Sequence, residues 1–331
     1  MKQVVLKQEL DAKPKAADFE LIDVETPECP KDGLLVKVRY ISLDPYVGTR
    51  LRGKHMGEAA PAPRTGLIPG AIVGEILESQ APGFKPGQFI HSMEGGWAEF
   101  IALKAEDVQI VDPEAAPLES YIGVLGMPGL TAWAGVTQLA KVRDGDVFLV
   151  NAAAGPVGGT AGQIARMKGA KTLIGIAGGQ EKCREVEESY GFDFCLDYKQ
   201  ADWKDGLKKA APDGISVHFE NVGSDMLSLA MSSMQLYGRA VLCGLAAHYH
   251  EDGPPAMTSI GMVIGKRASL HGLVVYDYYS RWDEFRNEVA PWVKSGKVAY
   301  IHDEVSGLEK APALMEKLMN GKNVGKCVVA L

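Results

Sequence analysis

A glycine-rich turn between an apolar strand and a helix has the clearest binding chemistry in this sequence. Residues 147–151 read as a strand, and Ala152-Ala153-Ala154-Gly155-Pro156-Val157-Gly158 follows directly. Small residues let such a turn bend sharply and bring backbone N–H groups close to phosphate oxygens, and the helix N-terminus behind it adds partial positive charge. The turn therefore predicts a pyrophosphate site formed by Gly155, Pro156, Val157 and Gly158.

The match to the dinucleotide-binding fingerprint G-x-G-x-x-G is incomplete, because Ala153 stands in place of the first glycine. The surroundings are those that the fingerprint requires. A helix is expected over about residues 156–168, and a second strand over residues 172–177. We favour a dinucleotide site over the alternative, a plain strand-to-helix turn.

The end of the second strand bears on which dinucleotide would bind. An NAD site usually carries an acidic residue here, whereas this strand runs into Ala177-Gly178-Gly179-Gln180-Glu181-Lys182. Lys182, with Tyr198 against the adenosine, would accept a 2′-phosphate, so the sequence predicts NADPH as cofactor. The alternative is that Lys182 is a solvated lysine at a helix start, and Glu181 keeps this alternative open.

Composition limits the class of protein. The chain has 331 residues, 46% of them hydrophobic and 23% charged, which is enough for two domains with sizeable cores. A net charge of −7 argues against a nucleic-acid partner, and no apolar run is long enough to predict a membrane span. Five scattered cysteines suit reduced thiols, and with an N-terminus that lacks a signal-peptide core they predict a cytoplasmic location.

The pattern of elements changes along the chain. Up to about residue 120, short β-rich runs alternate with Pro/Gly turns, which predicts a β-barrel-like domain. From about 125 to 290, strands alternate with helices, which predicts a doubly wound parallel sheet. We expect domains at 1–124, completed by about 298–331, and at 125–297. Because ligands lie outside the carboxyl ends of such strands, Asn221 and Cys243 with Gly244 should face the cofactor.

Several short motifs together resemble one enzyme family over essentially the whole chain. They are Ser42-Leu43-Asp44-Pro45-Tyr46, Leu125-Gly126-Met127-Pro128-Gly129, Ala153-Ala154-Gly155-Pro156-Val157-Gly158, Ala177-Gly178-Gly179-Gln180-Glu181-Lys182-Cys183, Glu220-Asn221-Val222-Gly223 and Asn323-Val324-Gly325-Lys326. The sequence resembles the zinc-independent medium-chain dehydrogenase/reductases, in the branch of prostaglandin, alkenal double-bond and curcumin reductases. The resemblance implies a Rossmann domain, a GroES-like β-barrel-type domain and a homodimer.

The resemblance also implies roles for individual residues. The pyrophosphate would contact Gly155, Pro156, Val157 and Gly158, and the 2′-phosphate end would contact Gly179, Lys182 and Tyr198. The ribose and nicotinamide would contact Asn221, Cys243, Gly244, Leu245 and Tyr249, and Leu273, Val274, Val275 and Asn323 would close over the nicotinamide. Substrate contacts would be Tyr46, Met127 and Tyr249. Two departures put the substrate in doubt: Gly48 stands where the family commonly has an arginine, and His250 where it often has an asparagine.

The metal ligands of related alcohol dehydrogenases are missing. No cysteine lies between residues 30 and 182, and Ala71-Ile72 stands where a His-Glu pair would be. We therefore expect no metal and, as the natural chemistry, reduction of the C=C bond of an enal or enone. Hydride would add to the β-carbon, and the resulting enolate oxygen would need a hydrogen-bond donor.

Tyr249 is the candidate donor, and Tyr46 the second tyrosine at the substrate. Packing over the cofactor is the alternative for Tyr249, and a buried tyrosine behind the Asp-Pro turn is the alternative for Tyr46. His248 and His250 are either a proton-donor pair or ordinary loop histidines, and Cys243 is a small strand-end residue rather than a nucleophile. Two other functions stay open: a quinone oxidoreductase and a non-catalytic NADPH-binding scaffold or sensor.

Overall fold

The computed structural model describes residues 1–53, 66–248 and 259–331. The chain divides into two compact units. The first unit comprises Met1–Gly126 with His302–Leu331, and the second comprises Met127–Ile301. Both divisions fall a few residues beyond the expected ones. No helix in the described ranges has both the length and the apolar character that a membrane crossing requires.

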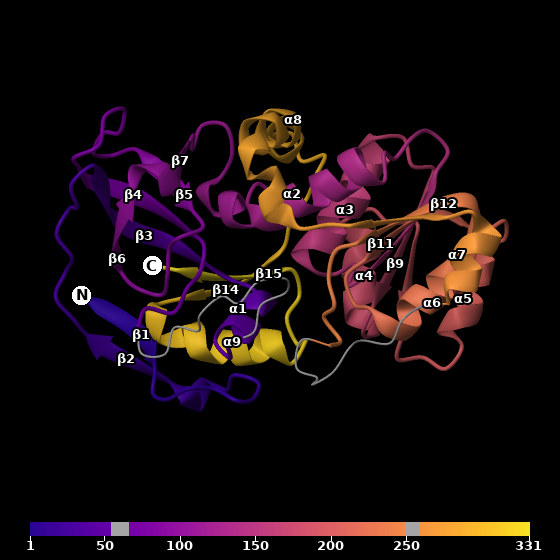
Figure 1. The fold of residues 1–331 in the computed structure, drawn as a ribbon, viewed down its shortest axis with the longest axis horizontal. Coiled ribbons are helices and arrows are strands. Elements are labelled where there is room, and N and C mark those ends of the chain that lie inside the picture. Colours follow the sequence, from indigo (N-terminus) through magenta and orange to yellow (C-terminus); the bar gives the residue numbers. More distant parts are fainter. Residues whose placement is uncertain (54–65, 249–258) are drawn as a thin grey trace. The chain divides into compact units, whose positions relative to one another are not determined.

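A six-stranded parallel sheet organises the second unit (Figure 1). Its strand order is β10-β9-β8-β11-β12-β13, so the chain starts in the middle, moves to one edge, and returns to build the other half. This is the order of a doubly wound dinucleotide-binding sheet. The predicted fold class is confirmed, and the direction of winding reverses between β8 and β11. The strands are β8 (Val147–Asn151), β9 (Thr172–Ala177), β10 (Phe194–Asp197), β11 (Ile215–Glu220), β12 (Met234–Leu242) and β13 (Ser269–Gly272).

The helices of the second unit, apart from the one that precedes β8, follow these strands in turn. They are α2 (Met127–Trp133), α3 (Pro156–Met167), α4 (Gln180–Glu188), α5 (Trp203–Ala210), α6 (Ser224–Ser232), α7 (Ile260–Lys266) and α8 (Trp282–Lys294). Helix α3 is buried on nearly every side from Gly158 to Ala165. A Cβ on Gly162 would lie 2.0 Å from the Phe192 ring, so a glycine is needed for the helix to pack this closely.

Antiparallel pairing dominates the first unit. Strands β14, β15, β3, β4, β5 and β7 are hydrogen-bonded in that order, and β6 pairs with β3. The C-terminal strand β15 pairs with β3, so the end of the chain returns to the first unit. The elements are β1 (Lys2–Leu6), β2 (Phe19–Asp23), β3 (Gly33–Leu43), α1 (Pro45–Arg50), β4 (Ile72–Ser79), β5 (Phe89–Ser92), β6 (Phe100–Lys104), β7 (Val108–Val111), β14 (His302–Ser306), α9 (Ala311–Met319) and β15 (Lys326–Ala330).

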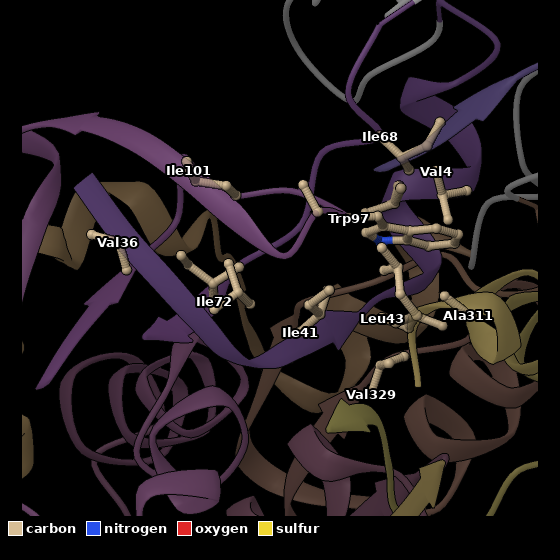
Figure 2. Packing of buried hydrophobic residues seen from close by; sticks show 14 of the residues in the cluster. Val4, Val36, Ile41, Leu43, Ile68, Ile72, Trp97, Ile101, Ala311 and Val329 are labelled. Atoms are coloured by element: carbon tan, nitrogen blue, oxygen red, sulfur yellow. The ribbon is translucent and has the colours of Figure 1, made fainter. Parts of the chain in front are cut away.

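One apolar cluster fills this unit. Figure 2 shows the Trp97 indole between Val4, Ile68 and Leu43, and all four side chains are fully buried. The Phe19 ring stacks on Trp97 with centroids 5.3 Å apart. Tyr46 packs at the border of the same cluster, so the core supports the short helix α1 on which it lies.

Candidate functional site

The turn between β8 and α3 has the close packing that its glycines predict. Ala152 adopts a left-handed conformation with φ of 49°, and Gly155 is the N-cap of α3 with Pro156 in the first turn. A Cβ on Gly158 would lie only 2.5 Å from the Ala152 carbonyl oxygen. Strand end and helix therefore approach so closely that only glycine fits at position 158. As at any helix start, the N–H groups of Val157 and Gly158 have no acceptor within the helix.

A buried polar cluster lies beside this turn, where winding reverses. Asn151 at the end of β8 and Glu220 at the end of β11 are both almost fully buried, and the Asn151 Nδ2 donates to Glu220 Oε1. The Asn151 Oδ1 accepts the Asn221 backbone N–H at 2.6 Å, and Asn221 Nδ2 donates to the Asn151 carbonyl at 3.0 Å. In open α/β sheets, ligands bind outside the carboxyl ends of the strands at such a reversal.

Glu220 accepts hydrogen bonds from several directions. Its Oε1 accepts the N–H groups of Val222 and Gly223, both at 2.7 Å, and its Oε2 accepts His218 Nε2 at 2.8 Å. Burial opposes ionisation, but the hydrogen bonds from His218, Asn151 and Gly223 and the charge interaction with His218 outweigh it and lower the pKa of Glu220 to about 2. Glu220 is therefore a carboxylate at neutral pH.

The segment after β12 is hydrogen-bonded onto the end of β11. The N–H groups of Cys243 and Gly244 donate to the Glu220 carbonyl, and that of Ala246 donates to the Asn221 carbonyl. The space over Gly223 is filled by Leu245 and His248, each with a carbon 3.0 Å from where a Cβ would stand. The predicted cofactor residues Asn221, Cys243, Gly244 and Leu245 thus belong to one hydrogen-bonded cluster.

The Cys243 thiol is in its protonated form at neutral pH. Burial raises its pKa to about 12, and the charge of Glu220 adds to the rise. A thiol in this state is a poor nucleophile, in agreement with its interpretation as a small strand-end residue.

The turn between β9 and α4 contains a carboxylate that the sequence argument missed. Gly179, with φ of 111°, donates its N–H to Asp197 Oδ1 at 2.7 Å. Strand β9 itself ends without an acidic residue, but Asp197 comes from the end of the neighbouring strand β10. The hydrogen bond from Gln200 comes first among the contacts that lower the pKa of Asp197, followed by two backbone N–H groups. The Asp197 carboxylate therefore stabilises the conformation of the β9–α4 turn.

The other residues predicted at this end lie near the turn. The Tyr198 hydroxyl lies 2.7 Å from where a Cβ of Gly178 would stand, and Tyr198 is 44% exposed. Lys182 lies in the first turn of α4 and is half-buried. The turn between β9 and α4 therefore has an exposed aromatic ring and a lysine close to it.

The remaining predicted residues of the second unit lie after β13 and at the start of α2. Leu273 is buried and donates its N–H to the Leu242 carbonyl, so the stretch after β13 lies beside the end of β12. Val274 is exposed, and Val275 begins a 3₁₀ turn. Met127 is the half-buried first residue of α2.

In the first unit, a buried ion pair adjoins Tyr46. Asp44 precedes α1 and accepts Lys326 Nζ at 3.0 Å, and the same ammonium donates to the Leu43 carbonyl. Ser42 Oγ donates to the other oxygen of Asp44. The pair joins the start of α1 to β15, three residues beyond Asn323, whose Nδ2 donates to the Gly325 carbonyl at 2.9 Å. The segment directly before Tyr46 is thus held in place by these hydrogen bonds.

Gly48, where the resemblance leads one to expect an arginine, has a packing role. A Cβ at this position would lie 2.5 Å from the Met319 methyl group, so residue 48 faces α9 directly. A larger side chain would have to displace this methionine.

The principal catalytic candidate, Tyr249, and its neighbour His250 lie outside the described residues. Among residues 1–53, 66–248 and 259–331, no group of three His, Cys, Asp or Glu side chains is placed to hold a metal ion. The clusters around Glu220 and Asp44 were missed from the sequence; the available signal was a polar residue ending each apolar strand.

Comparisons with known proteins define the class. Residues 156–295 match a family model described as zinc-binding dehydrogenase, and residues 2–111 match one described as the N-terminal domain of oxidoreductase. The chain is thus built like a two-domain dehydrogenase, with its nucleotide-binding half in the second unit.

Full-length relatives narrow this class. The chain is 37% identical to the NADP(+)-dependent 2-alkenal reductase of Nicotiana tabacum, covering 99% of this chain and 96% of the relative. It is 36% identical to the NADPH-dependent curcumin reductase of Escherichia coli, covering 96% and 92%. The crystal structure of Vibrio vulnificus CurA with NADPH superimposes with a TM-score of 0.91 at 32% identity, covering 100% and 99%. The chain belongs to the medium-chain dehydrogenase/reductase family, in the branch that includes these reductases.

Proposed function

We propose that this protein uses NADPH to reduce the C=C bond of α,β-unsaturated aldehydes or ketones. The observation that carries the proposal is the likeness, over nearly the full length of both chains, to an alkenal reductase and a curcumin reductase. The second unit adds a physical reason. Its β8–α3 turn is a cradle that a Cβ on Gly158 would fill, at the point where the sheet reverses.

The cofactor would be held by residues at the carboxyl ends of the strands. Gly155, Pro156, Val157 and Gly158 form the N-terminus of α3, where the N–H groups of Val157 and Gly158 are suited to a pyrophosphate. Lys182 and Tyr198, together with Gly179 at the start of α4, would bind the 2′-phosphate and the adenine. The Asp197 carboxylate accepts hydrogen bonds from the Gly179 N–H and from Gln200, so we assign it to holding this turn rather than to binding the cofactor.

The nicotinamide side is assigned to the remaining predicted residues. They are Asn221, Cys243, Gly244, Leu245 and Tyr249, with Leu273, Val274, Val275 and Asn323 closing over the ring. NADPH supplies the hydride when bound. Tyr249 would donate a hydrogen bond to the enolate oxygen, Tyr46 and Met127 would contact the substrate, and no metal would take part.

The second unit also offers a surface for a homodimer, which we include in the proposal. Strand β13 is an edge of the six-stranded sheet, and an edge strand presents unpaired backbone groups to a partner. Tyr237 on β12 and Ile264 on α7 are each 70% exposed. A twofold-symmetric dimer would cover such residues, and light scattering of the purified protein tests it. A cytoplasmic location stays a prediction.

Oxidation of NADPH in the presence of alkenals, enones and quinones tests the function. We expect turnover of at least one enal or enone, NADH being a poorer cofactor, with activity unchanged after exhaustive chelation. Turnover of quinones alone would replace the proposal by a quinone oxidoreductase. Tight NADPH binding without turnover of any compound would point to a scaffold or sensor.

A further inference from the structure

The central strands of the second unit carry a buried carboxylate at each end. Asp146 directly precedes β8, and it accepts Arg239 at 2.6 Å, Ser216 Oγ at 2.8 Å and the Arg143 N–H at 3.0 Å. Glu220 is the last residue of β11, at the opposite ends of these strands, and is 1% exposed. Both are buried and multiply hydrogen-bonded, but only Glu220 lies at the carboxyl ends of the strands, where a ligand binds.

Glu220 determines the orientation of the groups around it. An ionised carboxylate can only accept hydrogen bonds, so every neighbour must turn a donor toward it. The Asn151 amide therefore turns Nδ2 to Glu220, and its Oδ1 is left to accept the Asn221 N–H. The same carboxylate oxygen also accepts the N–H groups of Val222 and Gly223.

The influence of Glu220 extends to the next strand. Its backbone carbonyl accepts Cys243 and Gly244, and the turn that it holds accepts Ala246 and Ala247 through the Asn221 and Val222 carbonyls. The Glu220 side chain thus contacts the end of β8 and residues 222–223, and the backbone carbonyls of residues 220–222 in turn hold residues 243–247. Charge-assisted hydrogen bonds in a buried site hold such an arrangement more firmly than neutral ones.

We propose that Glu220 is a positioning residue for the nicotinamide half of the cofactor. Its carboxylate fixes residues 221–223 and 243–247 in the conformation that receives NADPH, and it contacts neither cofactor nor substrate itself. This inference rests on the proposed function only in requiring that NADPH binds at the strand ends.

The test compares Glu220→Ala with Asp146→Ala, its matched control in the same sheet. Both variants remove a buried carboxylate from the two central strands, and both should lower the melting temperature. Glu220→Ala should also weaken NADPH binding about tenfold or more, as measured by fluorescence titration well below the melting temperature, whereas Asp146→Ala should leave the Kd within about twofold.

Glu220→Gln adds a rescue arm. The glutamine Oε1 can still accept the Val222 and Gly223 N–H groups, so this variant should recover most of the NADPH affinity. If Glu220→Ala fails to fold, Asn151→Ala tests the same arrangement, and an unchanged Kd in it would overturn the inference. Equal effects of the Glu220 and Asp146 variants on the Kd would also overturn it.

The readout separates this inference from the proposed reaction. A wild-type protein that binds NADPH but reduces no enone contradicts the reaction, while the Kd comparison still decides the role of Glu220. A wild-type protein that does not bind NADPH contradicts both.

Discussion

Two neighbouring turns of the second unit have the same plan and different uses. The β8–α3 and β11–α6 turns both follow central parallel strands, and both reach a helix through a glycine N-cap, Gly155 or Gly223. At the second turn, Glu220 accepts the Gly223 N–H. At the first, the strand-end residue is Asn151, whose side chain bonds across to β11 instead. The comparison shows that a carboxylate at a strand end can bind the N–H groups of the following turn, so that these groups are not available to a ligand.

The β9–α4 turn is intermediate between the two. Its Gly179 N–H is bonded to Asp197 from β10, while Lys182 adds a positive charge in the first turn of α4. We therefore propose the β8–α3 turn for the pyrophosphate and the β9–α4 turn for the 2′-phosphate end.

The largest effect is expected from filling the β8–α3 turn. Gly158→Val would place a Cβ 2.5 Å from a backbone oxygen that no side-chain movement can relieve. We expect NADPH affinity to fall about 100-fold or more, corresponding to ~3 kcal/mol at the upper end of overpacking costs. Isothermal titration of NADPH measures this.

Gly162→Ala is the control for that variant. It overlaps the Phe192 ring from the same helix, one turn further along, so it should lower the melting temperature and keep the Kd for NADPH. An equal loss of affinity in both variants would contradict the assignment of the turn.

The β9–α4 turn predicts cofactor selectivity. Lys182→Ala should weaken NADPH by about 1.5 to 3 kcal/mol, roughly 10- to 150-fold, because a charge-assisted hydrogen bond to the 2′-phosphate is lost. NADH, which has no such phosphate, should bind as before. Wild-type protein with equal affinity for the two cofactors would contradict the prediction.

A smaller effect on rate is expected at Tyr249, which directly follows the segment held against the β11–α6 turn. Tyr249→Phe should lower kcat for an enone about 10-fold, or more if water is well excluded, and leave the Kd for NADPH nearly unchanged. Tyr46→Phe is the comparison variant. A larger loss in it would move the donor to the first unit, and an unchanged kcat in Tyr249→Phe would leave that residue a packing role.

The last effect is on stability rather than on cofactor binding or rate; it concerns the internal carboxylate of the β11–α6 turn and depends on pH. The pKa of Glu220 is lowered to about 2 in the folded protein, so its contribution is complete above the unfolded value of about 4.3 and is lost as pH falls toward 2. The difference in unfolding free energy between wild type and Glu220→Gln should shrink over this window, by at most ~1.4 kcal/mol per pH unit. Urea unfolding at several pH values measures it, and a constant difference would be contrary to expectation.

Local patterns in the sequence were sufficient for most of the fold. The strands at 147–151 and 172–177 and the helix beginning at Pro156 lie where predicted, because hydrophobic periodicity and glycine are local signals. The alternation of elements also predicted the doubly wound sheet. The assignment of individual side chains to the site remains a set of predictions.

Only the tertiary structure decided which polar groups meet. Asn151 and Glu220 are 69 residues apart, and they touch because β8 and β11 are adjacent at the reversal of the sheet. Asp197 reaches Gly179 because β10 lies beside β9, and Lys326 reaches Asp44 because β15 returns to β3. These pairings depend on strand order and register, which long-range packing selects, so no local pattern in the sequence specifies them.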